Sequence, residues 1–94
     1  MPVLGVLTLE IVLQNSHSLK DKRHVVKSLK DRLRNKFNVA VAEIEDQDLW
    51  QRAVVAAVTV SADHTYAEKV LQSVEEEAAA LLGPELAGTT VEWM

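Results

Sequence analysis

The hydrophobic pattern of this chain switches repeatedly between two periods, and the order of the switches restricts the fold more than any other feature. Apolar residues recur every second position in strands and every three or four positions along one face of a helix. Strand-like patterns occupy four segments, namely 3–13, 38–44, 50–61 and 89–94. Helical patterns occupy the stretches 16–38 and 63–82. The predicted order is therefore strand, helix, strand, strand, helix, strand.

This order predicts a ferredoxin-like α+β sandwich, a βαββαβ fold in which two helices cover one face of a four-stranded antiparallel sheet. Right-handed crossovers place the first and third strands in the centre, which gives the strand order 4-1-3-2. The third strand agrees with a central position because it is apolar on both faces. With 94 residues, 48% of them hydrophobic, the chain is expected to form one domain over 1–94.

Both helices carry boundary signals. Ser18 is a favourable N-cap, and Asp21 three residues later imitates the acid of a capping box. Gly83 followed by Pro84 is typical of a helix end. One residue fits this pattern less well, because Lys22 falls near the middle of the first helix's apolar face. We expect its stem to lie against the core and its ammonium group to extend outward to water.

The second face of the predicted sheet is not covered by the chain's own helices. The first strand presents there either its more apolar odd positions or its even positions, which are Leu4, Val6, Thr8, Glu10 and Val12. The third strand contributes Val or Ala whichever way it faces. An apolar face of that extent is typical of an interface, so we predict a homodimer through the sheet. The alternative is that these residues are ordinary scattered surface Val and Leu.

Positive charge is concentrated on the first helix. Eight of the ten Lys and Arg residues lie within 20–36, opposed there only by Asp21 and Asp31, although the net charge of the chain is −4. On a helical wheel, five of them form a line about 20 Å long beside the apolar face. We call these five the basic stripe: Lys20, Arg23, Lys27, Lys30 and Arg34. A polyanion would relieve their mutual repulsion, which predicts a nucleic-acid-binding surface; a solvated face is an equally favoured alternative.

The start of the same helix extends this candidate site. Free N–H groups at 18–21, next to His17, Lys20 and Arg23, could bind one phosphate. His17 and His24 could protonate beside an anion, although a solvent-exposed bystander role is favoured for both. Asp21 weakens this part of the site, because its carboxylate already suits that helix end.

A polar hairpin between the second and third strands is the second candidate site. It brings amide, carboxylate, indole and guanidinium groups together, and we call it the Trp50 corner: Gln47, Asp48, Leu49, Trp50, Gln51 and Arg52. The Trp50 ring could stack a nucleobase, but a lid over the core is the favoured interpretation because aromatic residues are few. The acids of 43–48 could bind a cation, although alternating acids alone are weak support for a site.

The sequence offers no catalytic, cofactor or metal motif. It contains no cysteine, no glycine-rich phosphate loop, no pair of histidines at metal spacing and no Ser-His-Asp constellation. The N-terminus lacks a signal-peptide pattern, and no apolar run approaches the ~20 residues of a membrane-spanning helix. We expect a cytoplasmic protein without a cofactor, a metal or a membrane partner.

Three runs of residues, covering 17–23, 27–43 and 47–53, carry a resemblance to a known family. They read H-S-L-K-D-K-R, K-S-L-K-D-R-L-R-N-K-F-N-V-A-V-A-E and Q-D-L-W-Q-R-A, and together they resemble the YlxP-like family of small bacterial proteins. That family has no assigned activity, and the resemblance covers nearly the full length. It implies a ferredoxin-like fold. Its members are commonly encoded beside translation-initiation and ribosome-maturation factors, which implies RNA or ribosomal partners.

Two functions follow from these features. The first is a non-enzymatic RNA-binding or ribosome-associated module that uses the basic stripe. The alternative is a dimeric module that binds a protein or a small ligand through the open sheet face and the Trp50 corner. An enzyme, such as an acylphosphatase-like hydrolase, ranks last, because the turn after the first strand lacks a glycine-rich anion cradle with arginine.

Overall fold

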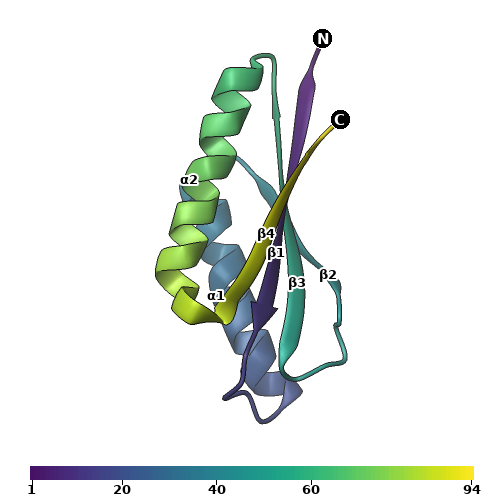
Figure 1. The fold of residues 1–94 in the computed structure, drawn as a ribbon, viewed down its shortest axis with the longest axis vertical. Helices are drawn as coiled ribbons and strands as arrows, with labels where there is room; N and C mark the ends of the chain where they lie inside the picture. Colours follow the sequence, from purple (N-terminus) through teal and green to yellow (C-terminus); the bar gives the residue numbers. More distant parts are fainter.

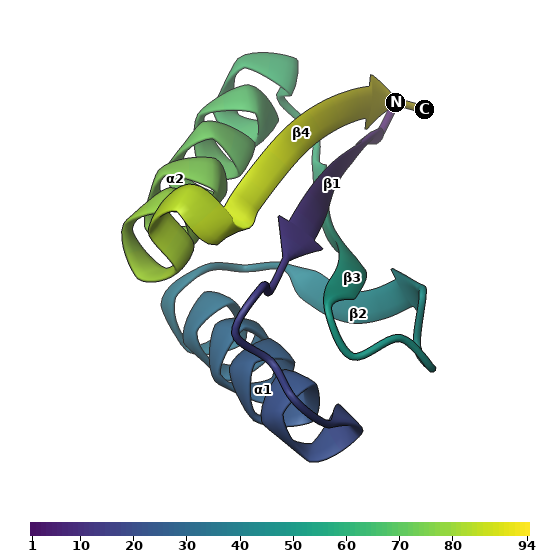
Figure 2. The ribbon, with the colours of Figure 1, turned by 60° about the horizontal axis from the view of Figure 1, so that its bottom comes forward.

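The computed structural model describes residues 1–94 and contains one four-stranded antiparallel sheet with two helices (Figure 1). The elements in chain order are β1 (Val3–Val12), α1 (Leu19–Lys36), β2 (Ala40–Glu45), β3 (Arg52–Ser61), α2 (His64–Leu82), the 3-10 turn η1 (Gly83–Glu85) and β4 (Leu86–Trp93). Figure 2 shows both helices on the same side of the curved sheet. The strands lie in the order β2-β3-β1-β4, which confirms the predicted fold and strand order.

The odd-numbered side of β1 faces the helices and supplies the centre of the core. Leu7, Leu9 and Ile11 are at most 1% exposed. They pack in one cluster with side chains of both helices, which include Val26, Leu29, Leu33, Leu71, Val74, Ala78 and Leu82. Burying a side chain of this size contributes about 1.5–3 kcal/mol. The period-two pattern of β1 and the helical spacing of α1 therefore meet in the same interior.

Gly5 is the only odd position of β1 without a side chain, and Trp93 explains it. A Cβ atom at Gly5 would lie 2.5 Å from the Trp93 ring and 2.8 Å from Leu71. The Trp93 ring, on the paired strand β4, occupies the space that a side chain would need, and its centroid lies 4.3 Å from the His64 ring. The end of β4 thus closes the core over the start of β1.

The helix ends match their sequence signals. The Ser18 hydroxyl accepts a hydrogen bond from the Asp21 N–H at 3.1 Å, and the Asp21 carboxylate accepts one from the His17 N–H at 3.1 Å. These bonds satisfy donors that a helix start leaves free. At the end of α2, Gly83 adopts φ +58°, a left-handed conformation that favours glycine.

Three strands begin at other residues than predicted. β2 begins at Ala40 rather than at residue 38. β3 begins at Arg52 rather than at residue 50, so Trp50 lies in the loop before it. β4 begins at Leu86 rather than at residue 89, because Gly88 continues the pairing opposite Glu10 instead of ending it. Each outer strand also carries one unmatched residue, Ile44 in β2 and Ala87 in β4, where the register shifts.

The face of the sheet away from the helices carries the even positions of β1. Pairing places Leu4, Val6 and Thr8 opposite Val60, Val58 and Ala56 of β3. Most of these apolar side chains are half-buried, and Val60 is 58% exposed. Charged residues occur on the face at Glu10, Glu45, Arg52 and Glu92. Neither helix combines the length and the apolar content that a bilayer-spanning segment needs.

Candidate nucleic-acid interface

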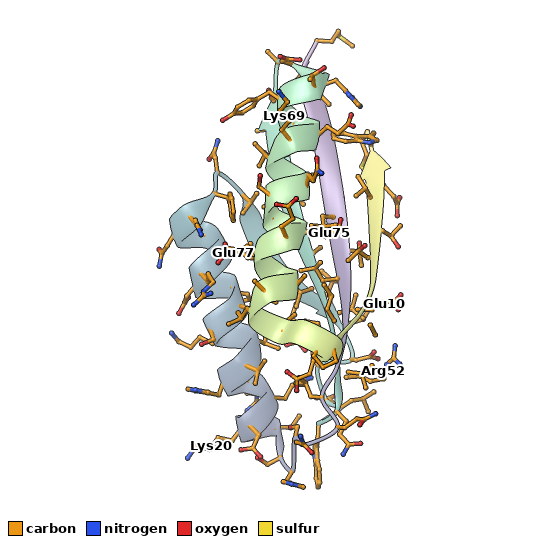
Figure 3. All side chains as sticks on the ribbon, turned by 60° about the vertical axis from the view of Figure 1, so that its left-hand side comes forward. Glu10, Lys20, Arg52, Lys69, Glu75 and Glu77 are labelled. Carbon is orange, nitrogen blue, oxygen red and sulfur yellow. The ribbon has the colours of Figure 1, made fainter.

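The basic side chains of α1 divide into two groups according to their partners. On the flank toward α2, Arg32 and Lys36 form ion pairs with Glu77 at 3.3 and 2.7 Å. Figure 3 shows Glu77 on α2 where that helix approaches α1. The hydrogen bond from Lys36 and the charges of Lys36 and Arg32 lower the pKa of Glu77 below its ordinary value. These two cations are therefore engaged in joining the helices.

The basic stripe lies on the other flank, toward β2. Lys20, Arg23, Lys30 and Arg34 have no acidic partner within ion-pair distance. Lys27 is the exception, since it binds Asp31 one turn later at 2.8 Å and lowers the pKa of that carboxyl through this hydrogen bond. The five residues predicted from the helical wheel thus share one flank, and four of them carry uncompensated charge.

A groove of about 350 Å³ runs between the stripe and β2. Its lining consists of Arg23, Val26, Lys27, Lys30, Asp31, Arg34 and Glu43. Both acids at this groove are already paired, Asp31 with Lys27 and Glu43 with Lys22 at 2.9 Å. The potential in the groove is therefore set by the free cations, which suits a phosphate backbone.

The start of α1 forms a second shallow depression. Its lining is Lys20, Asp21, Arg23, His24 and Lys27. The structure thus places His24 beside the stripe, whereas the predicted residue His17 is not part of this lining. The Asp21 carboxylate binds the His17 N–H, so that end of the helix already has an anionic partner.

Lys22 corrects one prediction. Its side chain does not extend to water but is 0% exposed. Its ammonium group donates to the backbone carbonyls of Asp46, Gln47 and Arg52 at 2.6, 3.1 and 3.3 Å. Together with the contact to Glu43, these bonds satisfy a charge that would otherwise be costly to bury.

The geometry of this lysine explains why it lies on the apolar face of α1. The carbonyls converge on it because the chain reverses between β2 and β3, where Asp46 adopts φ +62°. The ion pair with Glu43 is a close contact that is not directed as a hydrogen bond. The sequence contained one signal that Lys22 binds the loop between β2 and β3. That signal is a lysine inside an apolar helix face, combined with a short acidic hairpin.

Most polar side chains of the Trp50 corner are engaged by neighbouring segments of the fold. The Gln47 amide donates to the Glu43 carbonyl at 3.2 Å. The Gln51 amide donates to carbonyls of the segment before α1, at 3.4 Å to residues 14 and 16. The Arg52 guanidinium lies 3.4 Å from the Asp46 carboxylate. Within the corner, Asp48, Leu49 and Trp50 make none of these hydrogen bonds.

Trp50 corrects a second prediction, since it does not cover the core. Its side chain is 53% exposed and that of Leu49 is 47% exposed. The buried residue that contacts this hairpin from α1 is Lys22, whose ammonium group binds its carbonyls. Trp50 instead lines an open depression of about 550 Å³ together with Asp48, Leu49, Gln51 and Arg52.

The two candidate sites lie at the same end of the molecule. Figure 1 shows the start of α1 and the β2–β3 loop side by side at the bottom. Lys22 and Gln51 connect them through the contacts described above. The structure brings no three His, Asp or Glu side chains into a group that could hold a metal ion, so the acids of 43–48 do not form such a cluster.

Comparisons of structure support the fold. The de novo designed protein Foldit4 matches with a TM-score of 0.61 at 13% sequence identity, over 100% of this chain and 97% of the designed one. The de novo designed protein LFR1 1, with a ferredoxin fold, matches with a TM-score of 0.50 at 13% identity, over 100% of this chain and 84% of its own. At such identities the likeness concerns the fold alone.

Comparisons of sequence identify relatives. "Uncharacterized protein YlxP" of Bacillus subtilis (strain 168) is 40% identical over 72 residues, which make up 77% of this chain and 78% of the relative. The family model described as "Protein of unknown function (DUF503)" matches residues 4–90. The predicted resemblance is thereby confirmed, and the chain belongs to the DUF503 family of YlxP-like proteins, whose function is unknown.

Proposed function

We propose that the protein is a non-enzymatic RNA-binding module, associated with the ribosome or its RNA, that uses the basic stripe. One observation carries this proposal. Among the cations of α1, those that support the fold have acidic partners, whereas Lys20, Arg23, Lys30 and Arg34 have none. Uncompensated cations in a line repel one another, and a polyanion removes that repulsion.

The dimensions and chemistry of the stripe fit a nucleic-acid backbone. Fourteen residues separate Lys20 from Arg34, which corresponds to about 20 Å along a helix. The groove beside the stripe is lined by side chains that can reach phosphate oxygens, and Arg can bind them with two parallel N–H groups. Such contacts supply affinity without reading sequence, so the proposal concerns RNA in general. It places the protein in the cytoplasm, with the ribosomes.

Charge reversal tests the proposal. Arg34→Glu should weaken binding to RNA at low salt for all RNA sequences alike. The slope of log affinity against log salt concentration should also become shallower, by about the amount that one phosphate contact contributes. Lys69→Glu is the matched control, because Lys69 is exposed on α2, which contributes no residue to the groove beside the stripe, and the reversal changes the net charge equally. Fluorescence anisotropy with labelled RNA gives both quantities. Absence of RNA affinity at low salt, or equal losses in the two variants, would exclude the stripe as an RNA site.

A second candidate function is favoured by the open sheet face. We propose that a second copy of the chain covers this face, making the protein a dimeric interaction module. The apolar pairs between β1 and β3, such as Val6 with Val58, support this, because no element of the chain covers them.

Sedimentation at micromolar concentration tests the dimer. The wild type should sediment as a dimer, and Val58→Glu should shift it to the monomer. Ala80→Glu, on an exposed position of α2, introduces the same charge away from the sheet and should leave the dimer intact. A wild-type monomer at that concentration would rule the dimer out.

A further inference from the structure

The exposed ring of Trp50 lies on a loop that is anchored from several sides. Three backbone carbonyls of the β2–β3 connection bind the Lys22 ammonium group, and the Gln51 amide binds the segment before α1. An indole that is 53% exposed forgoes the burial that usually stabilises a tryptophan. The backbone on either side of the ring is therefore held by contacts that neighbouring residues make, while the ring itself stays in solvent.

The groups around the ring favour recognition of a nucleobase by stacking on its face rather than by hydrogen bonds to its edge. The amides of Gln47 and Gln51 already donate to backbone carbonyls, and the Arg52 guanidinium lies against Asp46. What remains at the surface of the corner is the flat indole, the aliphatic Leu49 and the carboxylate of Asp48. Every nucleobase has a face that can stack on such a ring, and this interaction tolerates any sequence.

The loop that carries the ring lies at the same end of the molecule as the start of the basic stripe. The groove is bounded by the basic stripe on one side and by Glu43 of β2 on the other, and β2 leads directly into the Trp50 corner. Figure 3 shows Lys20 and Arg52 toward the same end of the molecule, opposite Lys69. A backbone that follows the stripe toward the start of α1 therefore runs toward the end of the molecule that carries the Trp50 corner.

We infer that the ligand of this surface is single-stranded RNA, with phosphates along the basic stripe and one unpaired base stacked on Trp50. The inference rests on the proposed function and narrows it. In duplex RNA the bases are stacked on one another and their faces are not available, so a duplex can use the stripe but not the ring. Single strands offer both a backbone and free base faces, and combining a cationic groove with an aromatic platform is a common way to bind them.

The experiment separates the ring from the stripe. The probes are an oligouridylate of about twelve nucleotides, an abasic oligomer of the same length and charge, and an RNA duplex of that length. Wild-type protein should bind the oligouridylate about tenfold more tightly than the abasic oligomer, the size expected for stacking one base. Trp50→Ala should abolish this preference while leaving the abasic affinity unchanged, and Trp50→Phe should keep most of it. Because Trp50 is exposed, both variants are expected to fold, which circular dichroism checks.

A direct readout comes from fluorescence. In a Trp93→Phe background Trp50 is the only tryptophan, and stacking should change its emission with the oligouridylate but not with the abasic oligomer. Equal affinity of the wild type for these two oligomers would overturn the stacking inference while leaving the stripe proposal intact. Stacking is likewise ruled out if Trp50→Ala weakens binding of the duplex or of the abasic oligomer as much as binding of the oligouridylate. If no probe binds at low salt, the stripe proposal fails and takes this inference with it. In that case Trp50 is available to a protein partner.

Discussion

The two flanks of α1 carry the same kind of residue and use it differently. Toward α2, Arg32 and Lys36 share Glu77, and the three side chains bridge the helices. Toward β2, the cations of the basic stripe line a groove whose two acids are already paired, Asp31 with Lys27 and Glu43 with Lys22. Positive charge on a helix therefore indicates a ligand only where the cations have no acidic partner within the fold. From the sequence alone, the two flanks of α1 look equally basic.

The largest expected effect comes from the one lysine of α1 that belongs to neither flank. Lys22→Met removes the donor of three backbone carbonyls and leaves Glu43 without its cation, so we expect a loss of about 2–4 kcal/mol in the free energy of unfolding. Urea denaturation followed by circular dichroism measures it. Amide exchange should also rise selectively at residues 46–52.

The matched control for this change is Lys20→Met, two positions earlier on the same helix. Lys20 is exposed and has no ion-pair partner, so its replacement should alter stability by at most about 0.5 kcal/mol. A stability of Lys22→Met equal to that of Lys20→Met would show that the buried contacts make no net contribution.

The second prediction concerns the flank toward α2, where removing Glu77 should make Arg32 and Lys36 available to RNA. Glu77→Gln removes the partner of Arg32 and Lys36, so affinity for RNA at low salt should rise by a smaller factor than Arg34→Glu lowers it. The variant should also be less stable than the wild type near neutral pH. Because the folded-state pKa of Glu77 lies below its ordinary value of 4.5, the wild-type advantage exists above about that pH and is lost as pH falls through the lowered pKa.

Unfolding measured from pH 7 down to about pH 3 checks this dependence for both proteins. The two stability curves should converge in acid. Curves that stay parallel over this range would mean that ionised Glu77 does not stabilise the contact between the helices.

The smallest expected effect concerns RNA binding by the flank that carries the basic stripe. Asp31→Asn releases Lys27, which should add about one phosphate contact and steepen the salt dependence of RNA binding by nearly one unit. The same change in a Lys27→Gln background should have a much weaker effect, which salt titrations of both variants would reveal. An equal gain in the two backgrounds would mean that only the lost negative charge matters, and not the freed lysine.

Most of the fold could be predicted because each local signal agreed with the global arrangement. The alternation in β1, the spacing of Val26, Leu29 and Leu33, and the caps at Ser18 and Gly83 all point to the same architecture. The sequence left open which side of β1 faces the helices. The structure shows that the odd positions face the helices. Gly5 is one of these positions, and it leaves room on the helix side for the ring of its paired residue Trp93.

The site was harder to predict because it depends on contacts between distant segments. The stripe follows from helical spacing alone, and its role as a binding site stays a prediction. The expected positions of the Lys22 ammonium group and of the Trp50 ring were wrong, since Lys22 binds the carbonyls of a loop more than twenty residues away and Trp50 is exposed. Neither propensity nor periodicity carries information about such a contact.

The unmatched residues in the outer strands constrain how copies of this protein can meet. An uninterrupted edge strand is a template onto which another chain can add, strand by strand, toward a growing fibre. Here Ile44 and Ala87 each break the regular sequence of free N–H and C=O groups along an outer edge. A strand added at either edge would lose hydrogen bonds at the break on that edge. This disfavours association of copies through the sheet edges and leaves the open face as the favoured surface.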